Sequence, residues 1–157
     1  MRFLIDWSFS LQYSISIFLT ILILLINLIP THAANEMEYH YFSDGSYIVT
    51  VMESIDDNIN LLSTTVTKSK KATYYNKDGV AKWYVKVTGT FTYGNGTFKC
   101  TNSTVTAASQ STTWKISSKS GNKAIATATA KQYQNNSIIQ TITKSVTLTC
   151  SSTGKFS

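Results

Sequence analysis

The sequence predicts an all-β fold, a single antiparallel β-sandwich of about seven strands preceded by a hydrophobic signal segment. The only proline is Pro30, and Thr, Val, Ile and Tyr, which favour extended backbone, dominate the chain after it. Gly, Asn and Asp recur there roughly every ten residues, which is the turn spacing of sandwich folds. A helical repeat of apolar residues is hard to find in this part of the chain.

The chain begins with an apolar stretch at residues 11–30 that contains no charged residue. Pro30 ends this stretch and small residues follow it, so we expect a signal peptide over residues 1–33, cut after Ala33. The alternative is an uncleaved signal anchor, because the uncharged run between Asp6 and Glu36 is long enough to span a bilayer. In both cases the leader contacts the membrane during export. The rest of the chain is then secreted, or tethered outside the membrane.

Charge divides the exported part into two segments. Residues 34–63 hold six acidic residues and neither lysine nor arginine, whereas residues 64–157 hold 13 lysines and one acid, Asp78. Together they amount to roughly 120 residues, the size of one ordinary domain. We therefore expect one domain made of an acidic N-terminal segment with the first strand and a basic β-sandwich body. The asymmetry indicates either a face that binds polyanions or an acidic segment that neutralises a basic sheet.

The first three expected strands cover residues 47–53, 64–75 and 81–93. The second and third are joined by a turn whose Asp78-Gly79 pair suits a tight hairpin, because glycine accepts a positive φ. The third alternates most clearly, and its expected core face carries Trp83, Val85, Val87, Gly89, Phe91 and Tyr93.

The remaining strands are expected at residues 97–106, 113–120, 123–134 and 138–151. Turns are predicted at residues 94–96, at Gly121 and Asn122, and at residues 135–137. In residues 123–134 every second position from 124 to 130 is alanine, and this face is small enough for the close approach of a facing sheet or of large side chains such as Trp83 or Trp114.

Two cysteines, Cys100 and Cys150, lie in the exported part, and both fall on expected core faces. An even count in an exported chain favours a disulfide between them over two buried reduced thiols. Such a bridge would close a loop of about fifty residues and stabilise the fold by roughly 4 kcal/mol. The order Cys100, Trp114, Cys150 resembles the immunoglobulin core. Too few strands separate Trp114 from Cys150 for a true immunoglobulin domain, so the likeness extends to the architecture only.

A second resemblance covers most of the exported part. The runs "DGSYIVTV", "KWYVKVTGTFTYGNGTFKCT", "TTWKISSKSGNKAIATATAK" and "TKSVTLTCSSTGK" resemble a family of small secreted proteins of Gram-positive gut bacteria that has no assigned function. The resemblance implies export and an all-β domain. It implies no functional residues.

Residue types that carry catalysis or bind metals are sparse, and we expect neither an enzyme, a cofactor nor a metal site. His40 is the only histidine of the exported part, so no catalytic triad can be assembled and zinc lacks ligands. Paired carboxylates for a hydrolase would have to come from the acidic segment, which makes hydrolysis the weakest hypothesis.

Lysines and one tyrosine form the candidate binding face. The residues proposed to bind polyanions are Lys68, Lys70, Lys71, Lys82, Tyr84 and Lys86. We expect a non-enzymatic secreted or cell-surface binding module for anionic cell-envelope polymers or lipid head groups. The alternative is a secreted, bacteriocin-like antagonist of neighbouring cells. Lysines on exposed strands also prevent edge-to-edge aggregation without any binding role. Nucleic acid is a poor partner, because the only arginine lies in the leader.

Overall fold

The computed structural model describes residues 37–54 and 65–157, with Ser54 described for its backbone only. By their contacts all described residues belong to one compact unit. The expected signal segment at residues 1–33 lies outside the described residues. Within those residues, no helix has the length and hydrophobicity that a membrane span requires.

The described part is built from strands, so the all-β prediction is confirmed. Residues 37–54 and 65–157 hold eight strands where about seven were expected, because a short strand in the acidic segment precedes the first expected one. The strands are β1 (Met37–Tyr41), β2 (Tyr47–Ser54), β3 (Thr65–Tyr75), β4 (Ala81–Gly94), β5 (Thr97–Ser109), β6 (Trp114–Asn122), β7 (Ile125–Gln134) and β8 (Ser137–Thr147).

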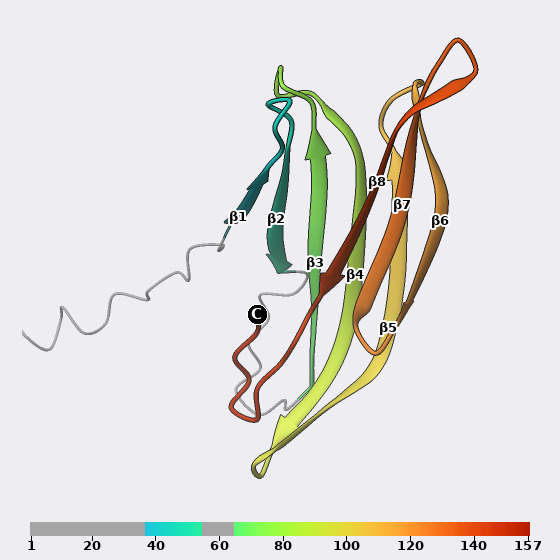
Figure 1. Ribbon diagram of the computed structural model, residues 1–157. Helices are drawn as coiled ribbons and strands as arrows, with labels where there is room; N and C mark the ends of the chain where they lie inside the picture. The colour runs from blue at the N-terminus through green and yellow to red at the C-terminus, as the bar shows by residue number, and fades with distance from the viewer. Residues whose placement is uncertain (1–36, 55–64) are drawn as a thin grey trace, which may run out of the picture. The chain divides into compact units, whose positions relative to one another are not determined.

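The strands form two antiparallel sheets, each in sequence order. One sheet has the order β1-β2-β3-β4-β5 and the other the order β6-β7-β8 (Figure 1). Every pairing joins strands that follow one another in the chain. The link from β5 to β6 carries the chain from the first sheet to the second. Contacts also run from β4 to all three strands of the smaller sheet.

One hydrophobic core draws on both sheets. Trp83, Val85, Val87 and Phe91 of β4 are buried as the alternation predicts, and the even-numbered alanines of residues 124–130 are fully buried. The two groups belong to one cluster of buried residues. A Cβ atom built on Gly89 would lie 3.3 Å from the Cβ of Ala124, so alanine and glycine allow the close approach that large side chains would prevent.

Two of the predicted turns are two-residue loops with a positive φ at both positions. Asn95 and Gly96 connect β4 to β5, and Asn135 and Asn136 connect β7 to β8. This conformation matches the twist of the paired strands and suits asparagine and glycine.

The turn predicted at Gly121 and Asn122 is wrong by two residues. Both residues belong to β6, and the loop consists of Lys123 and Ala124, with φ values of 50° and 63°. Gly121 is needed for space, because an added Cβ would meet the carbonyl oxygen of Ile125 at only 2.1 Å. Ala124 is held in its unusual conformation by Ser103, whose Oγ accepts a hydrogen bond from the Ala124 N–H at 3.0 Å.

The two cysteines are free thiols in the structure, so the expected disulfide is not formed. Each thiol donates to a nearby backbone carbonyl, Cys100 to Asn102 at 3.2 Å and Cys150 to Ser151 at 3.3 Å. Cys150 belongs to the core and Cys100 packs against it, as their predicted faces require. Burial raises the pKa of the Cys150 thiol.

Candidate functional site

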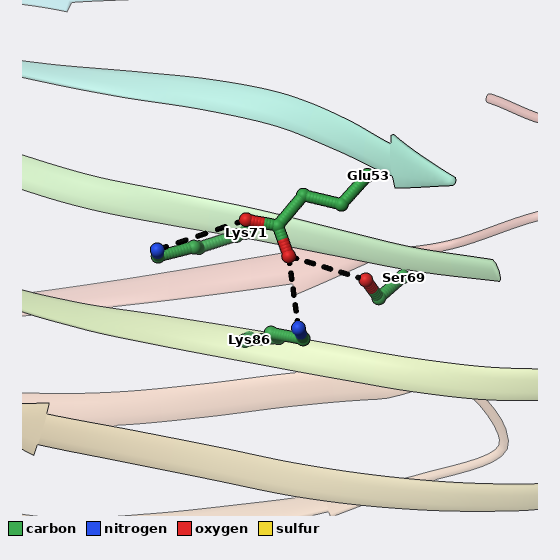
Figure 2. Close-up of polar contacts among 4 residues, drawn as sticks. All are labelled: Glu53, Ser69, Lys71 and Lys86. Atoms are coloured by element: carbon green, nitrogen blue, oxygen red, sulfur yellow. Dashed lines mark hydrogen bonds and ion pairs between the residues drawn. The ribbon is translucent and has the colours of Figure 1, made fainter. Parts of the chain in front are cut away.

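The site lies on the outer face of the five-stranded sheet, where two lysines face each other across neighbouring strands. Lys71 of β3 and Lys86 of β4 are direct partners in the ladder. Like charges in this relation repel each other, so the pair needs a counter-charge. Glu53 of β2 supplies it from the next strand (Figure 2).

Figure 2 shows that both carboxylate oxygens of Glu53 are engaged. Lys86 Nζ donates to Oε2 at 2.8 Å, Lys71 Nζ lies 3.7 Å from Oε1, and Ser69 Oγ donates to Oε2 at 3.4 Å. Burial opposes ionisation of this carboxyl. The hydrogen bond and charge of Lys86, then Lys71 and Ser69, outweigh burial and hold the pKa of Glu53 below its ordinary value. We call these four residues the Glu53 cluster.

Tyr84 extends the Glu53 cluster by an aromatic contact. Lys71 Nζ lies 4.9 Å from the centre of the Tyr84 ring, within the range of a cation–π interaction. Tyr84 is half-buried, and so are Lys71 and Lys86. The side chains of both lysines are 29% exposed, so part of each is open to solvent and to small anionic groups.

The structure brings together three of the six predicted binding residues, Lys71, Tyr84 and Lys86. Lys68 and Lys70 alternate with Lys71 along β3, which places them on the opposite face of the sheet, the face that carries buried Ala72 and Tyr74. The prediction that all six residues share one face is therefore wrong, because adjacent residues of a strand, such as Lys70 and Lys71, point to opposite faces.

Lys82 lines a separate pocket of about 360 Å³. The pocket has two aromatic side chains in its wall, and its other lining groups are charged or polar. Its residues are Asp44, Ser46, Tyr74, Asn76, Lys77, Lys82, Thr113, Trp114, Gln132 and Gln140. The pocket could not be predicted from the sequence, because its residues come from five separate stretches of the chain that only the pairing of strands brings together.

The acidic segment contacts the basic sheet at Glu53, so at this point charge neutralisation occurs within the fold. Asp56 and Asp57, two further acidic residues of this segment, lie outside the described residues. His40 is exposed on β1, where its ring makes an edge contact with Phe42 at 5.0 Å. In residues 37–54 and 65–157, no group of three His, Cys, Asp or Glu side chains is arranged to hold a metal ion.

Replacing Glu53 by glutamine is expected to lower the free energy of unfolding at neutral pH by at most about 1 kcal/mol, since the ion pairs are partly exposed. A carboxyl whose pKa is depressed in the folded state stabilises the fold above its unfolded pKa, and this contribution is lost as the pH falls through the folded value. The difference between wild type and variant should therefore shrink in acid. Urea unfolding of both proteins over a pH series measures it, and a difference that grows in acid would contradict the assignment.

Comparison of the chain with models of protein families, with curated proteins and with solved structures finds no match. The resemblance to small secreted proteins of Gram-positive bacteria stays a prediction. Any function must accordingly be argued from the geometry of the sheets.

Proposed function

We propose that the protein is a non-enzymatic, exported binding module for anionic polymers of the cell envelope, and that its two sheets form a β-sandwich that resembles immunoglobulin domains only in layout. The observation that supports binding is the surplus of positive charge in the Glu53 cluster. Two ammonium groups share one carboxylate, and the ring of Tyr84 lies beside one of them.

The arrangement suits a polymer with regularly spaced negative charges. Phosphate or carboxylate groups can take the outer side of each ammonium group, because a lysine has three donors and the contacts to Glu53 occupy only part of them. Tyr84 offers an apolar surface next to the charge for the uncharged part of a repeating unit. Further lysines on other strands raise the positive potential around the molecule and attract polyanions from a distance.

Retention of the purified protein on isolated Gram-positive cell wall, measured over a salt series, tests this proposal. Wild type should be retained at low salt and released as salt rises, because such binding is screened. The double variant Lys71→Gln/Lys86→Gln should be released at clearly lower salt. Glu53→Gln, which removes the competing carboxylate, should be released at higher salt than wild type.

The matched control is Lys119→Gln/Lys123→Gln, which removes the same charge from two exposed positions on β6 and the turn after it. The control should behave more like wild type than the double variant of the Glu53 cluster. Equal shifts in the two double variants would mean that only net charge matters, and no retention of wild type at low salt would refute the proposal. Cell wall stripped of its anionic polymers should retain none of the proteins.

A further inference from the structure

Among the described residues β1 is an edge strand of the five-stranded sheet, and it lacks two common devices against pairing with another chain, lysine and proline. The edges of the two sheets are β1, β5, β6 and β8. Lysine occurs in β5 (Lys99), in β6 (Lys115 and Lys119) and in β8 (Lys144), and lysine is a common device against edge-to-edge association. β1, with the sequence Met-Glu-Tyr-His-Tyr, has no lysine and no proline, and all five residues are exposed.

The free edge of β1 presents backbone groups at defined positions. In the hairpin to β2, the N–H of Phe42 donates to the carbonyl of Ser46 at 2.9 Å, so Phe42 points its backbone groups toward β2. In an antiparallel ladder these groups alternate in direction along the strand. His40 and Glu38 therefore also point toward β2, whereas Tyr41, Tyr39 and Met37 point their N–H and C=O groups away from it, toward the open edge.

We propose that β1 pairs antiparallel with β1 of a second copy of this chain, about a two-fold axis that passes through Tyr39. In this register Tyr39 lies opposite Tyr39 of the partner subunit, and Met37 lies opposite Tyr41 of the partner subunit. These residues carry the outward-pointing backbone groups, so they form the hydrogen-bonded pairs. Glu38 then lies opposite His40 of the partner subunit in the non-hydrogen-bonded pairs, where side chains approach most closely.

The pairing of Glu38 with His40 selects this register. In a backbone ladder the residues whose N–H and C=O groups point outward, Met37, Tyr39 and Tyr41, must face each other across the two strands. The two strands can therefore shift past each other only by steps that keep odd-numbered residues opposite odd-numbered residues. A shift to one side places Glu38 opposite Glu38 of the partner subunit, and a shift to the other side places His40 opposite His40 of the partner subunit. Only the register centred on Tyr39 pairs a carboxylate with an imidazole on both sides of the axis, where an imidazole N–H can donate a hydrogen bond to the carboxylate and a protonated imidazole adds an opposite charge.

The aromatic side chains on the outer face also favour a second copy. The ring of Tyr47 stacks on Tyr75 at 5.2 Å and lies 5.7 Å from Tyr41, which stacks on Tyr39 at 6.1 Å. This row crosses β3, β2 and β1 and ends at the open edge, where Tyr39 and Tyr41 are 50% and 68% exposed. Pairing of two β1 strands continues the row across the axis, with Met37 against an aromatic ring, a favourable contact.

The expected product is a dimer whose two five-stranded sheets are joined into one continuous sheet. A five-residue strand pair buries a small area, so the dimer should form reversibly and depend on protein concentration. The proposal is independent of polymer binding, because β1 and the Glu53 cluster share no residue.

Sedimentation equilibrium of the purified chain tests the pairing through its charges. His40→Glu places two carboxylates opposite each other on both sides of the axis and should raise the dimer dissociation constant about tenfold. Adding Glu38→Lys to this variant places opposite charges across the axis and should restore the wild-type constant. Both positions are exposed, so the fold should persist, which circular dichroism checks. The proposal would be overturned if the wild type stays monomeric, or if the dimer dissociation constant is the same in the wild type and in both variants.

Oxidative crosslinking tests the register directly. The variant Tyr39→Cys places two thiols opposite each other at the axis, at a backbone separation of about 5.5 Å that a disulfide can span. It should yield a covalent dimer in which peptide mapping finds the crosslink at position 39 of both subunits. The control Glu38→Cys places the two introduced thiols away from each other and should not crosslink. Crosslinking of the control alone, or of neither variant, would refute this register.

Discussion

Replacing Trp83 by alanine is expected to lower the free energy of unfolding by about 3–5 kcal/mol, a large part of the stability of a domain of this size. Trp83 is 1% exposed, and its ring contacts those of Tyr74 at 6.1 Å and Trp114 at 6.4 Å. Alanine removes the contacts of one ring to both neighbours and leaves a cavity between the sheets.

Trp83→Phe should cost far less than the alanine variant, for a reason specific to this position. Trp83 Nε1 is buried without a hydrogen-bond partner, the one such side-chain atom among the described residues. A buried unpaired donor costs about 1–3 kcal/mol, and phenylalanine removes it while keeping an aromatic ring in place. The lost volume therefore lowers the free energy of unfolding, and the removal of the unpaired donor raises it.

The matched control for this prediction is Trp114→Phe. Trp114 is 3% exposed in the same aromatic cluster, so the substitution removes the same atoms. Its indole nitrogen is not among the buried atoms that lack a hydrogen-bond partner, so removing this nitrogen offsets none of the lost stability. Urea unfolding should show a smaller loss for Trp83→Phe than for Trp114→Phe. An equal or larger loss at Trp83 would mean that its N–H has a partner, such as a buried water.

The sequence predicts the strands well because each depends on local information. Alternation of side chains along β4 identifies its buried face, and asparagine and glycine mark the loops at residues 95–96 and 135–136. The loop at Lys123 and Ala124 could not be predicted in this way. It is fixed by the close approach of Gly121 to Ile125 and by the hydrogen bond that the Ala124 N–H donates to Ser103, a residue of the other sheet.

The candidate site could be predicted only in part, since it depends on the register between strands. Lys71 and Lys86 face each other because β3 and β4 pair in one register, and Glu53 reaches them because β2 lies on the other side of β3. A count of lysines carries no such information. Alternation could have separated Lys70 from Lys71 from the sequence alone, because adjacent residues of a strand point to opposite faces.

Ala128→Leu is expected to lower the free energy of unfolding by about 1–3 kcal/mol, because it inserts three carbon atoms into a filled core. Ala128 is fully buried in β7, the central strand of the three-stranded sheet, with paired strands on both sides. The strand cannot move outward without breaking one of these ladders. On the same face, a Cβ atom added to Gly89 would lie only 3.3 Å from the Cβ of Ala124, which shows how little space separates the two sheets there.

The control is Ala108→Leu, the same enlargement on the outer face of β5. Ala108 is half-buried and lies opposite Tyr84 in the ladder, on the side of the sheet away from the core. A leucine there can extend over the open face, so stability should change by about 0.5 kcal/mol or less. Equal stability of the two variants would show that the alanines do not limit how closely the sheets approach. A loss confined to Ala128→Leu would instead identify the alanine face of β7 as the feature that sets the distance between the two sheets.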